Sequence, residues 1–409
     1  MGAEILDSRY AWTRLGVSLL IATIGNIGMW VVIVVMPAVQ AEFGLDRAEA
    51  SYPYTMTMIG FALGNFAIGR IVDRFGITAA LSGAAVLISG SFALSAISPT
   101  VLILTALHFF VGFGTAASFG PLIADVSLWF LKRRGIAVAI AASGNYLSGA
   151  IWPVLLAGVQ AQMGWRAVYL ILAIIVVVAV VPLSLLLRTR VPAAATEHSD
   201  AISGLRAQTA GFKPATLAWL LAIAGIGCCV AMSMPQVHIV SFCVDLGYGP
   251  AVGSQMLALM LLGGVVSRLI SGLLSDHLGG AKTLLIGSAL QCIALFLYLP
   301  FDGLVSLYVV SAIFGLSQGG IVPSYAVVVR EYMPSKEAGE RVGFVMMSTI
   351  FGMALGGWMS GWIYDMTGSY QMAFWNGILW NFLNIGIMIL ILFRSRPRLH
   401  RPKVGSVAA

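Results

Sequence analysis

The chain has 409 residues, of which 59% are hydrophobic and only 10% are charged. Soluble domains carry about 25% charged residues, so this chain lacks the polar side chains that a water-facing surface of its size requires. The mean hydropathy of +0.94 agrees with this, and the 46 glycine residues follow no three-residue repeat. The composition excludes several soluble domains and a collagen-like chain, and it predicts a helical protein that crosses a membrane many times.

Twelve apolar runs are each long enough to cross the hydrocarbon core of a bilayer, which takes about 20 residues. Since backbone groups cannot stay unpaired in lipid, these runs are expected to form helices. The first run is far longer than the apolar core of a signal peptide, about 7–15 residues, so we expect it to be a span. The spans cover roughly residues 12–39, 50–71, 78–97, 100–125, 135–162, 165–188, 214–244, 250–274, 281–300, 303–329, 339–364 and 370–394.

The lysine and arginine residues lie mostly on one side of this topology. Of 23 such residues, all but Arg47, Arg166 and Arg268 fall at the N-terminus, in loops after even-numbered spans, or in the C-terminal tail. The positive-inside rule therefore predicts a plasma (inner) membrane protein with both termini in the cytoplasm. The net charge of +7 is explained by this topology, and no nucleic-acid partner is expected.

The segment 189–213 differs in composition from its surroundings and is expected to be a cytoplasmic linker. It separates two predicted six-helix bundles, residues 1–188 and 214–394, and residues 395–409 form a cytoplasmic tail. The four cysteines lie in apolar runs without disulfide or zinc spacing. No phosphate-binding glycine loop, nucleophile with a base, or deep carboxylate pair is found. We therefore expect no enzyme activity, no cofactor and no metal.

An internal repeat relates the two halves. The stretch GRIVDRFGITAAL after span 2 aligns with GLLSDHLGGAKTL after span 8 at an offset of 203 residues. The same offset pairs Gly112 with Gly315 and Gly44 with Gly247. The repeated motif contains Gly69, Arg70, Asp73, Arg74 and Gly76 in the first half, and Gly272, Asp276 and Gly279 in the second.

These loops resemble the Gly-x-x-x-Asp-Arg-x-Gly signature of the major facilitator superfamily. The resemblance implies an all-α membrane transporter with twelve transmembrane helices in two pseudo-symmetric six-helix bundles. The small Gly69 and Gly272 are expected to allow close helix packing. The charged motif residues, such as Arg70 and Asp73, are expected to act in gating or structure rather than in substrate binding.

Four further stretches resemble the monocarboxylate transporter family and its bacterial oxalate/formate-antiporter-like relatives. They are WFLKRRGIAVAIAASGNYLSG from Trp129, PQVHIVSFCVDLG from Pro235, SRLISGLLSD with Arg268, and GWIYDMTGSYQMAF from Gly361. The chain departs from that family in three ways. Gly264 replaces an aspartate four residues before the arginine, span 1 has no lysine after Arg14, and span 11 lacks the second cation of the oxalate carrier.

Arg268 is the only lysine or arginine deep within a predicted span. An arginine at mid-helix costs about 2.5–3.5 kcal/mol on insertion scales, so such a residue normally faces a water-filled cavity and has a function. With no aspartate nearby in its helix, an anionic substrate is expected to balance it, because guanidinium binds carboxylate through two parallel hydrogen bonds. A structural arginine bound to helix carbonyl groups is the alternative.

Other polar side chains within the spans are further candidates, because the resemblance implies that spans 1, 4, 5, 7, 8, 10 and 11 line the cavity. His108 and His238 are candidates for proton coupling, against a simple packing role. Asp125, at the cytoplasmic end of span 4, is expected to be a gating residue. The candidates for substrate contact, besides Arg268, are Asn26, Tyr54, Asn145, Tyr146, Gln318, Tyr325, Ser348 and Thr349.

The sequence thus favours a secondary transporter of a small monocarboxylate or related organic anion that works by alternating access. Protons or a counter-anion are the expected coupling partners, and a monomer is the expected functional unit. An exporter of drugs or other hydrophobic compounds is the alternative, in which Arg268 is structural. A membrane-embedded sensor is a third class, but the linker and tail are too short for a signalling domain.

Overall fold

The computed structural model describes residues 6–130, 133–189, 212–332 and 335–394. This part is helical and contains no strand, which confirms the predicted all-α fold. The first half comprises α1 (Arg9–Gly25), α2 (Ile27–Phe43), α3 (Arg47–Ala50), α4 (Tyr52–Phe75), α5 (Ile77–Ala96), α6 (Val101–Thr115), η1 (Ala116–Ser118), α7 (Gly120–Leu128) and α8 (Arg134–Leu185). The second half comprises α10 (Pro214–Asp245), α11 (Pro250–Leu278), α12 (Gly280–Leu297), α13 (Leu304–Gln318), α14 (Ile321–Tyr332), α15 (Ser335–Thr367) and α16 (Tyr370–Arg394).

The predicted spans 5 and 6 together form α8, which has 52 residues. A straight helix of that length would extend for about 78 Å, more than twice the thickness of the hydrocarbon core, about 30 Å. Gly164, with φ 78° and ψ 169°, breaks the helix and turns the chain back. Eleven helical segments of the described residues are long and apolar enough to cross a membrane, and the longest contains this turn. The fold therefore fits twelve crossings.

Spans 1, 4 and 10 are interrupted helices. In span 1, α1 and α2 meet at Asn26, whose side-chain amide donates to the carbonyl oxygens of Ala22 at 2.8 Å and Ser118 at 3.1 Å. In span 4, η1 lies between α6 and α7, and in span 10 Gly319 and Gly320 separate α13 from α14. Hydrogen bonds such as those of Asn26 satisfy the backbone groups that a break releases inside the membrane.

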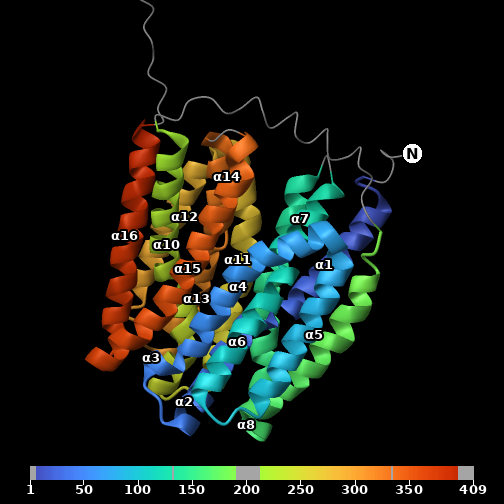
Figure 1. Cartoon of the computed structure of the whole chain (residues 1–409). Helices are drawn as coiled ribbons and strands as arrows, with labels where there is room; N and C mark the ends of the chain where they lie inside the picture. Colours follow the sequence, from blue (N-terminus) through green and yellow to red (C-terminus); the bar gives the residue numbers. More distant parts are fainter. Residues whose placement is uncertain (1–5, 131–132, 190–211, 333–334, 395–409) are drawn as a thin grey trace, which may run out of the picture.

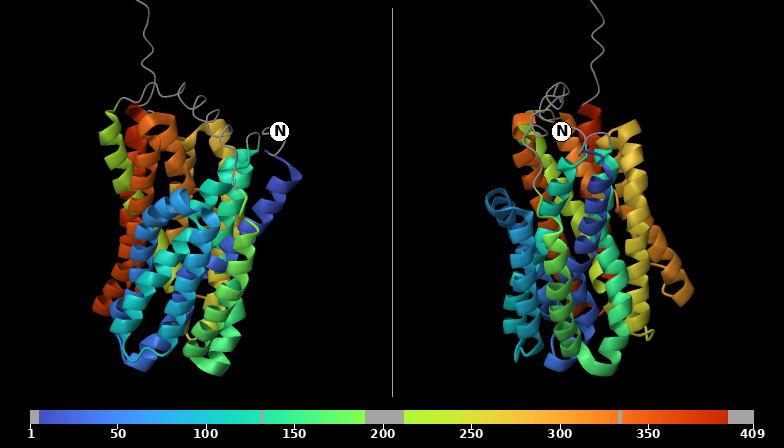
Figure 2. Two further views of the ribbon diagram at one scale, coloured as in Figure 1. Left: turned by 45° about the vertical axis from the view of Figure 1, so that its right-hand side comes forward. Right: turned by 90° about the vertical axis from the view of Figure 1, so that its right-hand side faces the viewer.

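The helices form two bundles that stand side by side (Figure 1). The helices α1–α8 make up the N-terminal bundle and α10–α16 the C-terminal bundle, and Figure 2 shows from two further sides that the long helices run between the same two ends. Across the interface, α8 packs on α11, and α4 packs on α15. We call the end that contains α3 the α3 end. The terminal end is the opposite one, where α1 begins and α16 ends (Figure 1).

The sequence repeat is also a repeat of backbone conformation. Gly44 and Gly247 have φ values of 62° and 80°, and Gly76 and Gly279 have φ values of 89° and 84°. Residues other than glycine are strained at such angles. Corresponding helices of the two halves therefore end in the same way, which accounts for the paired glycines.

The contact between α4 and α6 recurs between α11 and α13. A Cβ atom on Gly112 would collide with the backbone of Thr57, and one on Gly315 would collide with the backbone of Met260. The two contacts are related by the same offset of 203 residues. Small residues allow such close helix packing in membranes, so the repeat specifies the internal packing of both bundles.

Candidate functional site

The centre of the candidate site is Arg268, which crosses the interface between the bundles. Its side chain, only 7% exposed, extends from α11 toward α8. The Nη1 group donates to the carbonyl oxygen of Ala142 at 2.6 Å, and Nε donates to that of Gly319 at 3.3 Å. The guanidinium carbon lies 4.2 Å from the centre of the Tyr146 ring. Arg268 therefore contacts both bundles at once.

The charge of Arg268 has no carboxylate partner among the described residues. The ion pairs found there join Arg14 to Asp125, Arg47 to Asp245 and Arg166 to Glu42. The hydrogen bonds of Arg268 to carbonyl oxygens agree with the structural alternative raised above, but neutral acceptors leave its positive charge uncompensated.

Gly264 lies one helical turn before Arg268, where the related family has an aspartate. A Cβ atom at this position would be 3.0 Å from the Cδ2 and Cε2 atoms of Tyr146. The tyrosine ring therefore fills the space into which an aspartate side chain would extend. An aromatic ring, rather than a carboxylate, lies beside the guanidinium.

Three of the predicted polar residues lie next to this site in the N-terminal bundle. The amide of Asn145 donates to Oδ1 of Asn26 at 3.3 Å and is 3.2 Å from the sulfur of Met29. The indole of Trp30 donates to the carbonyl oxygen of Asn145 at 3.0 Å. Asn145 directly precedes Tyr146 in α8, so the predicted Asn26, Asn145 and Tyr146 belong to one region.

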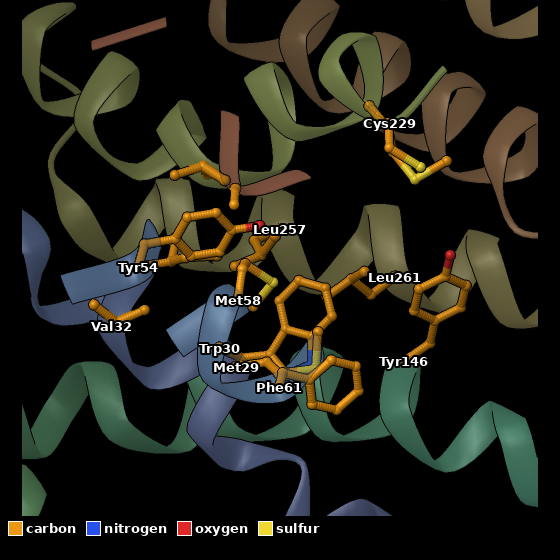
Figure 3. Packing of buried hydrophobic residues seen from close by; sticks show 14 of the residues in the cluster. Met29, Trp30, Val32, Tyr54, Met58, Phe61, Tyr146, Cys229, Leu257 and Leu261 are labelled. Atoms are coloured by element: carbon orange, nitrogen blue, oxygen red, sulfur yellow. The ribbon is translucent and has the colours of Figure 1, made fainter. Parts of the chain in front are cut away.

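The rest of this central region is apolar and aromatic. Figure 3 shows Trp30, Met58 and Leu257 close together between the ribbons of the two bundles, with Tyr54 and Leu261 on either side. The predicted Tyr54 packs on α15, since a Cβ atom on Gly357 would be 2.7 Å from its Cε1 atom. The site thus combines one cation with aromatic and sulfur-containing side chains.

Gln318, another predicted residue, pairs with Gln236, which sequence reasoning missed. Nε2 of Gln236 on α10 donates to Oε1 of Gln318 on α13. Both side chains are buried, and Gln236 Oε1 and Gln318 Nε2 have no hydrogen-bond partner within the described part of the chain. We call Gln236 and Gln318 the amide pair. The signal in the sequence was an amide within the apolar span 7, two residues before His238.

The remaining predicted contact residues bond within the C-terminal bundle. The hydroxyl of Tyr325 donates to Oδ1 of Asn384 at 2.8 Å, and Nδ2 of Asn384 donates to Oγ of Ser288 at 2.7 Å. Ser348 and Thr349 donate their hydroxyl groups to carbonyl oxygens of their own helix, at 2.9 and 2.7 Å. Ser348 and Thr349 therefore have partners within α15. Tyr325 takes part in a set of hydrogen bonds that joins α14, α16 and α12.

The two buried histidines have neutral partners. Nδ1 of His108 is 2.9 Å from the hydroxyl of Thr57, and Nε2 is 2.8 Å from that of Tyr169. Nε2 of His238 is 2.7 Å from the carbonyl oxygen of Gly357, and Nδ1 is 3.1 Å from the hydroxyl of Tyr370. These contacts agree with packing roles, and proton coupling by either histidine stays a prediction.

Asp125 and the repeated motif lie toward the terminal end. Oδ2 of Asp125 accepts hydrogen bonds from Arg14 at 2.8 and 3.2 Å, which join α7 to α1 within one bundle. Arg70 and Arg74 lie over the rings of Phe66 and Phe75, at 4.3 and 5.2 Å. The predicted Asp73 and Asp276 side chains fall outside the described residues.

The prediction of close helix packing at Gly69 and Gly272 is wrong. Among the atoms that the structure describes, none lies within 4 Å of a Cβ atom placed on either residue. Both glycines lie on partly exposed faces of α4 and α11 near the terminal end. Close packing of these two helices occurs nearer the α3 end, where Gly112 approaches Thr57 and Gly315 approaches Met260.

A polar cluster that sequence reasoning missed joins the bundles at the α3 end. The guanidinium of Arg47 forms an ion pair with Asp245 at the end of α10, and the carboxylate of Asp365 in α15 accepts from the backbone N–H groups of Arg47 and Ala48 at 2.8 and 2.7 Å. Tyr364 lies under the guanidinium, 5.2 Å away. We call Arg47, Asp245 and Asp365 the α3-end clasp. Sequence reasoning treated Arg47 only as a marker of topology, although both aspartates lie in the family-like stretches.

Comparisons with known proteins agree with this architecture. A family model described as Major Facilitator Superfamily matches residues 18–303 and 221–407. Monocarboxylate transporter 13 of Rattus norvegicus is 28% identical over 271 residues, which cover 64% of this chain but only 61% of that protein. The agnestins efflux protein AgnL12 of Paecilomyces divaricatus is 22% identical over 338 residues, covering 81% of this chain and 74% of that protein.

A solved structure with the same fold is a bacterial homologue of the human lysosomal transporter Spinster in an inward-facing and occupied conformation. Its TM-score is 0.68 at 16% sequence identity, and the match covers 95% of this chain and 96% of that one. At this identity the likeness concerns the fold alone.

Proposed function

Because the chain belongs to the Major Facilitator Superfamily, we propose that it is a secondary transporter of a small monocarboxylate or related organic anion, working by alternating access. The observation that carries the proposal is Arg268, a buried cation at the bundle interface without a carboxylate partner among the described residues. The likeness to a monocarboxylate transporter supports the same substrate class.

Binding of a carboxylate at Arg268 balances a charge that is costly to bury alone. A guanidinium carries five N–H groups, and the two hydrogen bonds to Ala142 and Gly319 leave further donors for an anion. The Tyr146 ring on one side and the apolar residues around Trp30 and Met58 suit the carbon skeleton of an organic acid. An inorganic anion would gain nothing from this lining.

The position of Arg268 couples binding to the movement of the bundles. Its partners Ala142 and Tyr146 belong to one bundle and Gly319 to the other, so an anion that draws the guanidinium away from α8 changes contacts across the interface. Alternating access requires such contacts to differ between states. The positive-inside rule predicts a cytoplasmic terminal end, and on that orientation the α3-end clasp joins the bundles at the outer face.

Export of hydrophobic compounds is the second candidate. The apolar and aromatic centre of the interface and the likeness to an efflux protein favour it. In that case the hydrogen bonds of Arg268 to carbonyl oxygens serve only to hold the bundles together, and the substrate needs no negative charge.

Uptake into proteoliposomes separates the two candidates. The purified chain is reconstituted, and uptake of labelled lactate, pyruvate, formate and benzoate is measured beside that of their neutral amides. We expect saturable uptake of one or more acids and none of the matching amides. Equal uptake of acids and amides, or transport of hydrophobic neutral compounds alone, contradicts the organic-anion proposal.

A further inference from the structure

The two side chains of the amide pair are only partly hydrogen-bonded, and one acceptor and one donor atom remain. Two facing carboxamides can exchange two hydrogen bonds, but only the one from Gln236 Nε2 to Gln318 Oε1 is made. Gln236 Oε1, an acceptor, and Gln318 Nε2, a donor, remain buried without partners among the described residues. Buried polar groups are rarely left unpaired, so this pattern points to a missing third group.

The two unpaired atoms would be satisfied by a group that donates one hydrogen bond and accepts another. In each carboxamide the oxygen and the nitrogen are bonded to the same carbon atom. The unpaired Oε1 of Gln236 and the unpaired Nε2 of Gln318 therefore lie beside the hydrogen bond that joins the two side chains. A hydroxyl group can satisfy both with a single oxygen atom, since it has one O–H donor and two acceptor lone pairs. A carboxylate cannot, because it has no proton to donate to Gln236.

The amide pair lies between Arg268 and the α3-end clasp. Gln318 directly precedes Gly319, whose carbonyl oxygen accepts from Arg268. Gln236 precedes Asp245, the last residue of α10, by nine positions, which is about 13 Å along the helix. One member of the amide pair is therefore next in the chain to a carbonyl partner of Arg268, and the other lies in the part of α10 that leads to the clasp.

From this arrangement we propose that Gln236 and Gln318 bind a hydroxyl group of the substrate and give the transporter a preference for hydroxylated organic acids. The inference rests on the proposed function, because it requires the carboxylate of the same molecule to bind at Arg268. The hydroxyl donates to Gln236 Oε1 and accepts from Gln318 Nε2. Arg268 selects the charge, and the amide pair selects the second polar group.

The test compares matched acids that differ only in one hydroxyl group. Binding of 2-hydroxypropanoate against propanoate, and of 3-hydroxybenzoate against benzoate, is measured on the purified full chain by competition with uptake in proteoliposomes. The wild type is expected to bind at least one hydroxylated acid about three- to tenfold more tightly than its partner, the effect of one neutral hydrogen bond.

Substitution by methionine keeps the length of the side chain and removes both amide atoms. Gln236→Met and Gln318→Met should each bring the affinity ratio close to one, mainly by weakening the hydroxylated acid. The matched control is Gln291→Met, because Gln291 is equally buried but both of its amide atoms contact Cys228. This control should keep the wild-type ratio.

A ratio of one in the wild type for both pairs of acids overturns the inference, and so does a wild-type ratio that persists in both folded variants, as expected when the pair holds only a water molecule. These outcomes leave the proposed function intact, because acids still bind. Failure of the wild type to bind any of the four acids contradicts the proposed function instead, and the inference with it.

Discussion

The guanidinium carbon of Arg268 lies 4.2 Å from the centre of the Tyr146 ring, and the two residues belong to different bundles. A cation over an aromatic ring contributes about 0.5–2 kcal/mol, with the larger values at buried sites. The contact crosses an interface that must rearrange during transport. The group proposed to hold the substrate is therefore also a group that holds the bundles together.

The relation between Gly264 and Tyr146 predicts the effect of restoring the missing aspartate. Gly264→Asp should place a carboxylate next to Arg268 and displace the tyrosine ring. The new carboxylate competes with the substrate, so acid affinity should fall about tenfold or more, the value of a hydrogen bond to a charged group. Competition with uptake in proteoliposomes measures this loss.

The control for this variant is Gly264→Asn, which adds a side chain of the same size without charge. It displaces the ring equally but leaves the guanidinium unbalanced. Affinity should therefore fall less than for Gly264→Asp. Equal losses in the two variants would mean that steric displacement of Tyr146, and not charge, explains the effect.

The α3-end clasp predicts a shift between conformations. Asp245→Asn weakens the ion pair with the buried Arg47, and we expect it to favour opening at the α3 end by about 1–3 kcal/mol, the cost of a buried donor without its partner. A cysteine at Thr55, which faces Ala354 across the interface, reports the change when the native cysteines are replaced. A membrane-impermeant thiol reagent should label it faster in the Asp245→Asn background.

Arg166→Gln provides the matched control for the clasp. It breaks an ion pair with Glu42, but both partners belong to the N-terminal bundle and are about 40% exposed. Labelling at position 55 should stay as in the wild type. Faster labelling in this control as well would attribute the effect to a general loss of charge rather than to the clasp.

The surroundings of the buried acid–base groups predict how uptake depends on pH. Asp125 is held by Arg14 within one bundle, whereas the ring nitrogens of His108 lie at hydrogen-bond distance from the hydroxyl groups of Thr57 and Tyr169. We predict that His108→Gln changes the pH profile of uptake more than Asp125→Asn does. Profiles of wild type and His108→Gln that superimpose would remove His108 from the coupling mechanism.

The distribution of basic residues predicts the orientation of the chain in the membrane. Cysteine at Arg166, which lies just after the break at Gly164, should react with an impermeant reagent from outside intact cells. Cysteine at Arg206, in the linker, should react only after permeabilisation. The reverse pattern would put the α3-end clasp on the cytoplasmic side and overturn the positive-inside argument.

Much of the fold could be predicted because its causes are local. The twelve spans follow from apolar runs of sufficient length, and the repeat follows from glycines such as Gly44 and Gly247, which share a positive φ. The break at Asn26 could not be predicted, because its amide is satisfied by Ser118, 92 residues away in the chain. The wrong prediction at Gly69 has the same origin, since a small residue permits close packing but does not show which helix will approach.

The site could be predicted only as a set of polar residues within spans. Arg268, Asn145 and Tyr146 belong together in the structure, but Tyr325 bonds instead to Asn384 inside its own bundle. The amide pair and the α3-end clasp depend on contacts between distant helices, which no spacing in the sequence records. Tertiary packing decides these partners.

Binding of an organic acid to folded Arg268 variants tests the central claim most directly. Wild type, Arg268→Lys and Arg268→Gln are purified, their insertion and folding are verified, and the affinity for an acid that the wild type transports is measured by thermal shift, since a ligand of the native state raises its stability. A hydrogen bond to a charged group contributes about 1.5–3 kcal/mol, or ten- to a hundredfold in affinity. Lysine keeps the charge without the planar fork and should weaken binding about tenfold or more, whereas glutamine loses both and should abolish measurable binding. Unchanged affinity in folded Arg268→Gln would contradict the account and favour export of hydrophobic compounds.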